Sequence, residues 1–141
     1  MEVVQDENSY SIVRFQAGEE VIAKLQEWCA EQGIQSGWVS ALGAASAVTL
    51  SFYDLAVHSY QDREVVEDVE IVSLVGNIAR ASGIPVIHLH GSFGTKNYQT
   101  LSGHVKRVVV SATCEMLVQQ LTGAMERQHD DATGLHLLSA R

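Results

Sequence analysis

From Ser36 onward the chain is a nearly continuous series of β-strand patterns, and one helical pattern precedes them. Tyr10–Gln16 is rich in β-branched and aromatic residues, which favours a strand. Gly18-Glu19-Glu20 is predicted to open a helix with acidic residues in its first turn, and Gly33 is predicted to end it. One helix against many strands predicts an α+β domain, with a mixed or mostly antiparallel β-sheet packed on that helix.

Short polar or small-residue segments divide the β-rich region. We expect a turn of small residues after Gly43, a loop over the polar stretch 59–64, and a glycine-rich polar loop after Gly94. The apolar runs between these breaks predict strands at Gly37–Gly43, Ala47–Asp54, Val69–Ala79, Ile84–Gly94, Val105–Val110, Ala112–Leu121 and, as an edge strand, Leu135–Leu138.

The length of 141 residues favours a single domain over 1–141, and 46% hydrophobic residues are enough for a core. The N-terminus lacks the apolar segment of a signal peptide, and no apolar run reaches membrane-spanning length, so we expect a cytoplasmic protein without membrane contact. Cys29 and Cys114 form no C-x-x-C pattern. We expect them to be buried free thiols rather than a disulfide.

Acidic residues outnumber basic ones by 17 to 9, which gives a formal net charge of −8. Duplex DNA binding needs Lys and Arg side chains to neutralise phosphates, so this charge opposes direct DNA contact. Lys106-Arg107, the compact basic cluster, is interpreted as a solvated strand face. Ile71-Val72 and Val108–Val110 are apolar on both strand faces, which predicts a second covered surface and favours a homo-oligomer.

Three of the six histidines lie in one short region of the sequence. His88 and His90 share one strand face because side chains alternate, and Leu89 points to the other face. If the chain folds back after Gly91, His104 on a neighbouring strand reaches the same place. Three imidazoles form the ligand set of a divalent metal with an open coordination position.

The alternative is that each histidine is an ordinary polar residue of the sheet, satisfied by one hydrogen bond. His58, His129 and His136 stand apart from the motif, and we expect surface or packing roles for them.

Motifs along nearly the whole chain, from about Tyr10 to Leu138, resemble the plants-and-prokaryotes conserved (PPC) domain. They occur in the family order: G-E-E-V, Gly37–Ala44, Leu50–Asp54, Ile71–Ile78, His88–Gly91 and Ser102–His104. The resemblance implies a single α+β unit of the free-standing prokaryotic type, with its core at about residues 10–138, that assembles as a homotrimer. It also maps the histidines of the family onto His88, His90 and His104, and implies a metal there, with Zn²⁺ favoured by the imidazole ligands.

In plants the PPC domain lies beside AT-hook peptides that bind the A·T-rich minor groove, and bacterial members carry a DNA-binding label by association. This chain has no Arg-Gly-Arg-Pro-like hook and no basic tail. The resemblance therefore implies a DNA-associated or regulatory role, whereas the residues of this chain oppose direct DNA binding.

We expect a homotrimeric, metal-binding module that acts in regulation, through a protein partner, rather than an enzyme. The alternative is a zinc-dependent hydrolase or lyase with water in the open metal position and Glu115 as acid–base candidate. Glu115 also suits a charge at a sheet or subunit edge. Ser92 and Tyr98 are weaker polar candidates. The apolar residues Trp38, Phe52 and Phe93 are interpreted as core or subunit-contact residues.

Overall fold

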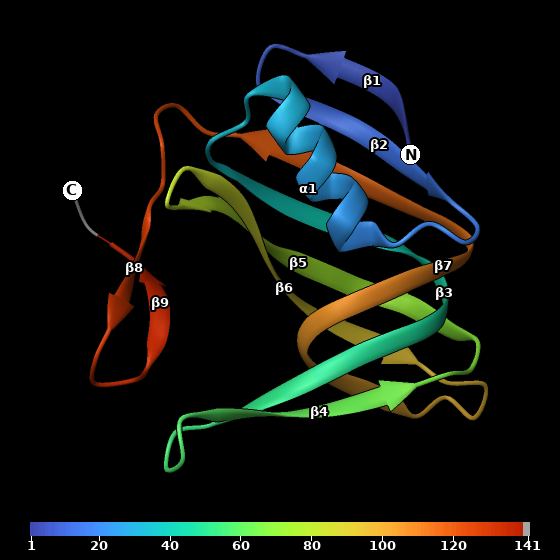
Figure 1. The fold of residues 1–141 in the computed structure, drawn as a ribbon. Coiled ribbons are helices and arrows are strands. Elements are labelled where there is room, and N and C mark those ends of the chain that lie inside the picture. The colour runs from blue at the N-terminus through green and yellow to red at the C-terminus, as the bar shows by residue number, and fades with distance from the viewer. Residues whose placement is uncertain (140–141) are drawn as a thin grey trace.

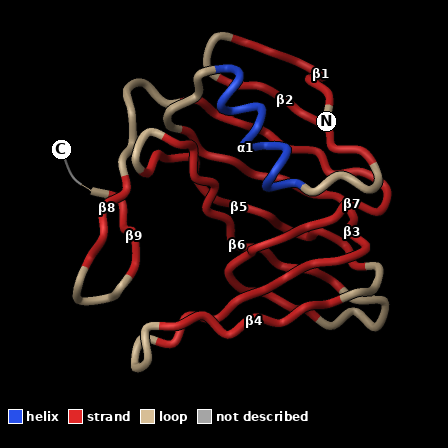
Figure 2. Tube along the Cα trace, viewed as in Figure 1, coloured by secondary structure: helices blue, strands red, loops and turns tan. Residues whose placement is uncertain are grey.

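The computed structural model describes residues 1–139, which form one helix and nine strands. In chain order the elements are β1 (Glu2–Glu7), β2 (Tyr10–Gln16), α1 (Val21–Gln32), β3 (Gly37–Asp54), β4 (Ser59–Val65), β5 (Val69–Ala81), β6 (Ile84–Gly94), β7 (Thr100–Gln120), β8 (Arg127–Asp130) and β9 (Leu135–Leu138). Figure 1 shows the arrangement of these elements, and Figure 2 shows how strongly strands dominate the chain. The predicted α+β class is confirmed.

Seven strands form one sheet in the order β1-β2-β7-β6-β5-β3-β4, and every strand pairing in it is antiparallel. β3 also pairs with β7, so β7, β6, β5 and β3 close into a ring. Closure leaves few free sheet edges, which limits unwanted strand addition. Among the described residues, β8 and β9 form a separate two-stranded sheet beside the main one (Figure 1).

α1 packs against β6 and β7 and covers one face of the closed sheet (Figure 1). Its buried residues recur at helical spacing, and Trp28 among them is 8% exposed, as the sequence predicts for a core position. They meet a core built from fully buried side chains of the strands, including Phe15, Leu74, Leu89, Phe93 and Met116. Burial of each such side chain contributes about 1.5–3 kcal/mol to folding.

The helix begins three residues later than predicted. Glu20 is its N-cap, and its carboxylate accepts hydrogen bonds from the backbone N–H groups of Ile22 and Ala23. Glu19 lies before the helix and pairs with the N-terminal amine of Met1. The prediction of acidic residues in the first turn is therefore wrong, because both glutamates precede Val21. The end at Gly33 is as predicted, with φ of 68° in the left-handed region.

Two predicted breaks in the β-rich region are wrong. Gly37–Asp54 is one strand, β3, without a turn after Gly43, and Thr100–Gln120 is one strand, β7. The two strands pair with each other along most of their length, and the small residues near Ala45 lie at shifts in register rather than at a turn. Continuous pairing therefore overrides the local preference of small residues for a break.

The polar stretch 59–64, predicted as a loop, lies in β4, and β1 was not predicted at all. Both are outer strands of the main sheet, and their side chains are largely exposed. Such strands lack the apolar alternation by which a strand is recognised in sequence. The predicted edge strand Leu135–Leu138 is confirmed as β9, which pairs with β8.

Cys29 and Cys114 are buried and free, as predicted. Burial raises the pKa of each thiol to about 12, so both act as small apolar core residues. Among the described residues, no helix has both the length and the apolar character that crossing a membrane requires.

One face of the sheet carries apolar side chains that no other described residue covers. Ser40 on β3 lies opposite Val75 on β5 and Leu117 on β7, and Trp38 and Leu42 are its same-face neighbours on β3. These four apolar residues, Trp38, Leu42, Val75 and Leu117, are 40–57% exposed, and we call them the apolar face. Of the three residues predicted to lie in the core or a subunit contact, Phe93 is buried, whereas Trp38 and Phe52 are outside the core of the chain.

Candidate metal centre

The strands β6 and β7 bring three imidazoles together. His90 lies directly opposite His104, and His88 occupies the same face of β6 two residues earlier. Leu89 between them points inward and is fully buried, which holds β6 in this register. The alternation predicted from the sequence is therefore present, although the chain folds back at residues 95–99 rather than directly after Gly91.

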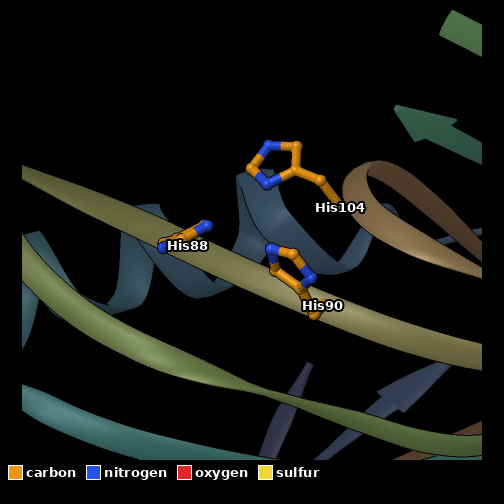
Figure 3. Close-up of side chains that lie close together, drawn as sticks. All are labelled: His88, His90 and His104. Carbon is orange, nitrogen blue, oxygen red and sulfur yellow. The ribbon is translucent and has the colours of Figure 1, made fainter. Parts of the chain in front are cut away.

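The three rings face one another across a small gap (Figure 3). Their centroids are 5.2 Å apart for His88 and His90, 5.0 Å for His88 and His104, and 5.4 Å for His90 and His104. One ring nitrogen from each residue lies within 4.8 Å of the other two. Three nitrogen donors this close are spaced as ligands of one metal ion, since Zn–N bonds are about 2.0–2.1 Å long.

The glycine at position 76 lets β5 approach the strand that carries two of these histidines. Gly76 pairs with Leu89, and a Cβ at this position would lie 1.9 Å from the carbonyl oxygen of His88. Any larger residue would push β5 and β6 apart next to the backbone of His88. Gly76 is therefore part of the support of the cluster.

The environment keeps two of the imidazoles neutral. Burial lowers the pKa of His88 to about 4, and the nearby positive charge of Arg127 adds to the effect. Burial also lowers the pKa of His104, and the neighbouring His90 and Lys106 act in the same direction. Neutral imidazole is the form that binds a metal ion, so these donors suit a metal at neutral pH.

The cluster opens into a cavity of about 710 Å³. The ring of Tyr60 lies 5.2 Å from that of His104 and 4.8 Å from that of Tyr53. The β8–β9 hairpin closes part of the cavity. The lining residues are Ser51, Phe52, Tyr53, Tyr60, Val86, Ile87, His88, His90, Gly103, His104, Arg127, Gly134, Leu135, His136 and Leu137.

Arg127 on β8 is a side chain of the cavity that the sequence did not reveal. Its Nη2 donates to the Oδ1 of Asn77 at 2.8 Å and lies 3.1 Å from Nδ1 of His88, while Nη1 donates to the carbonyl of His136 at 2.9 Å. His136, predicted to stand apart, lines the same cavity, whereas His58 and His129 do not. No motif marks Arg127, because its place depends on how the C-terminal hairpin docks.

Of the predicted catalytic candidates, Glu115 and Tyr98 are not brought to the cluster. Glu115 lies eleven residues further along β7 than His104, opposite Arg14 and Leu42, and does not line the cavity. Tyr98 is 97% exposed in the turn between β6 and β7. Ser92 is not among the residues of the large cavity, but it lines a smaller hollow together with His90 and Ser73.

The donor set agrees with zinc or another metal that prefers imidazole. His88, His90 and His104 offer three nitrogens and no carboxylate, which disfavours the oxygen-seeking ions Mg²⁺ and Ca²⁺. A set of three protein ligands leaves a tetrahedral ion one further position.

Comparison with known proteins identifies the family. The model of the Plants and Prokaryotes Conserved (PCC) domain matches residues 4–122. The chain belongs to this family. No functionally curated protein sequence matches it.

Solved structures of the family share the fold. A protein from Bacteroides thetaiotaomicron, whose name provisionally assigns it DNA binding, is 27% identical, with 98% of this chain and 96% of that one covered and a TM-score of 0.94. A metal-containing protein from Archaeoglobus fulgidus is 31% identical over 99% of this chain and 100% of its own, with a TM-score of 0.89. A PPC protein from Pyrococcus horikoshii, 21% identical over 99% of this chain and 94% of its own, has the same fold with a TM-score of 0.87.

Proposed function

We propose that this PPC protein binds one divalent metal ion per chain through His88, His90 and His104, and that the ion is zinc. The convergence of three ring nitrogens within 4.8 Å of one another carries the proposal. The metal-containing relative from Archaeoglobus fulgidus supports it. The alternative is that the three histidines are ordinary polar residues of the sheet, each satisfied by its own hydrogen bond. It does not account for the convergence of all three rings at one place.

Metal analysis of the purified protein tests this proposal. Wild-type protein should hold close to one equivalent of zinc, and replacing any one of the three ligands by alanine should remove most of it without loss of the fold. His129→Ala is the matched control, because His129 is exposed and lies outside the cavity. Zinc content that is equally low in wild type and in the ligand variants would refute the metal site.

We further propose a homotrimer in which the apolar face meets neighbouring subunits. The face is continuous with the metal cluster, because Val75 lies directly opposite His90 and Asn77 links Trp38 to His88 in register. Exposed apolar patches of this kind mark interaction surfaces. The metal centre then lies near a subunit boundary.

For the biological role we propose regulation in the cytoplasm through a protein partner, in association with DNA rather than by direct contact. Five of the nine basic residues are engaged with carboxylates: Arg14, Lys24, Arg80, Lys106 and Arg107. A cation that is already paired with a carboxylate contributes little to the neutralisation of a DNA phosphate.

A second candidate function is a zinc-dependent enzyme, and the cavity beside the three histidines favours it. When bound, zinc in a three-histidine site holds a water whose pKa falls toward ~7, which supplies a nucleophile. Among the described residues, no carboxylate lines the cavity to serve as acid or base, so Tyr60 and Arg127 would have to orient a substrate. A screen of ester and carbon–carbon lyase substrates, with His90→Ala as control, tests this function: turnover that depends on zinc and on His90 supports it.

A further inference from the structure

We infer that the cavity beside the histidine cluster binds a small organic carboxylate, held by Arg127 and packed against Tyr53, Tyr60, Leu135 and Leu137. The inference rests on the proposed metal site and adds a ligand class to it. Three observations carry it: the bonding of Arg127, the charge of the cavity wall and the donor chemistry of His88.

Arg127 is a part-buried cation without an anionic partner among the described residues. Its bonds go to the amide oxygen of Asn77, the carbonyl of His136 and a ring nitrogen of His88. Its Nε is buried and has no hydrogen-bond partner. A carboxylate ligand would compensate that charge, and a guanidinium can hold it with two parallel hydrogen bonds.

Among the residues that the structure describes, none that lines the cavity is an acid. The chain has 17 Asp and Glu against 9 Lys and Arg, yet neither Asp nor Glu is among the residues that line the cavity. The nearby Asp62 is already engaged, because it accepts from Ser51 Oγ at 2.6 Å and from Lys106 Nζ at 2.8 Å. Arg127 therefore makes the cavity locally attractive to anions within an acidic protein.

Metal binding would release Arg127 from His88. A guanidinium only donates hydrogen bonds, so Nδ1 of His88 must accept in this contact, and neutral His88 then carries its proton on Nε2. A neutral imidazole bound to a metal has no free lone pair on its other nitrogen. The Arg127–His88 contact and metal ligation by His88 therefore exclude each other, and a loaded site leaves Nη2 free for a ligand.

The remaining walls suit the body of a small organic molecule. A volume of about 710 Å³ lies in the usual range of small-molecule sites. Tyr53 and Tyr60 form one aromatic side, and Leu135 and Leu137 on β9 form an apolar side. Such walls favour an organic carboxylate over a hydrated inorganic anion.

Isothermal titration of the full chain with benzoate tests the inference, with benzamide as the uncharged probe and inorganic phosphate as the alternative anion. Zinc-loaded wild type should bind benzoate, and Arg127→Gln should weaken it by about ten- to a hundredfold, the usual worth of a charged hydrogen bond. Arg127→Lys should recover part of the affinity. Arg107→Gln, which removes an exposed, ion-paired arginine, should change nothing. Zinc and benzoate should each raise the affinity of the other by the same factor.

Equal binding of benzoate by wild type and by a folded Arg127→Gln variant would overturn the inference, and so would equal binding of benzamide. Tighter binding of phosphate than of benzoate would overturn the carboxylate assignment. Zinc analysis on the same samples separates the two proposals. Full zinc content without benzoate binding refutes only the ligand site, whereas Arg127-dependent benzoate binding by a chain that takes up no zinc refutes the metal site and the coupling.

Discussion

Replacing Gly76 by alanine should damage both the fold and the metal centre. The new Cβ would lie 1.9 Å from the carbonyl oxygen of His88, 2.8 Å from Cδ2 of Leu89 and 2.9 Å from the carbonyl carbon of His88. Reaching even the 3.0 Å limit that real Cβ atoms respect requires β5 and β6 to separate by 1.1 Å (3.0 − 1.9) at this point. The obstacle is backbone, which cannot rotate away as a side chain does.

Forced overpacking of this kind costs about 1–3 kcal/mol of the free energy of unfolding. For a chain of 141 residues that corresponds to a fall in Tm of roughly 3–12 °C. Because the displaced carbonyl belongs to His88, we expect zinc content to fall as well. Urea denaturation monitored by circular dichroism, with zinc analysis of each sample, measures both effects.

Gly94→Ala is the matched control on β6. Its new Cβ would lie 3.4 Å from Cγ2 of Val72, an ordinary contact, so stability should stay unchanged or rise by up to about 1 kcal/mol. If Gly76→Ala proves as stable as Gly94→Ala and holds as much zinc, the close approach of β5 to His88 does not support the site.

Three further predictions concern pH, assembly and DNA. Metal-free wild type should lose stability as the pH falls from about 6.5 to about 4, because the unfolded chain takes up a proton on His88 in this window and the folded chain does not; His88→Gln should remove that part of the slope in urea denaturation. Light scattering should report a trimer for wild type and for the exposed control Val66→Asp, but smaller species for Leu117→Asp on the apolar face; a wild-type monomer or dimer would refute the trimer. Fluorescence anisotropy at physiological salt should show weak or no binding to A·T-rich and mixed duplexes. Sub-micromolar binding with a steep salt dependence would show that the acidic net charge does not prevent DNA binding.

Local periodicity accounts for the parts of the fold that were predicted correctly. In the sequence, the helix is visible as an apolar stripe that ends at Gly33. The strand β6 is visible as an apolar run with His88 and His90 on one face. The breaks predicted inside β3 and β7 were wrong because the two strands pair through their small residues. Ala45 lies opposite Val110 and Ala47 opposite Val109, with register shifts that bend both strands together. Such long-range pairing leaves no mark in a local window.

The convergence of the three histidines could be predicted because strand alternation fixes two of them and the third follows a glycine on the next strand. The cavity around them could not. Tyr60 lies on β4, in a stretch predicted as a loop, and Arg127 and His136 lie on the C-terminal hairpin. Their positions depend on contacts between segments far apart in the sequence, for which no spacing rule exists.

The three histidines and Arg127 lie on parts of the molecule that differ in stability. The three histidines stand on β6 and β7 inside the closed ring of strands, where Leu89 and other buried side chains hold the backbone. Arg127, Leu135 and Leu137 stand on a two-stranded sheet that is attached to the main one by a few polar contacts. The backbone N–H of Arg80 donates to the carbonyl of Met125 just before β8, Arg127 donates to Asn77, and the hydroxyl of Tyr53 donates to the carbonyl of Thr133. A two-stranded hairpin has little stability of its own, so it opens at a lower free-energy cost than the ring. Opening of the hairpin would remove the guanidinium of Arg127 and one apolar wall of the cavity while leaving the three histidines in place. We therefore expect the affinity for the proposed metal to depend on the closed ring of strands, and the affinity for the proposed carboxylate to depend on the hairpin as well.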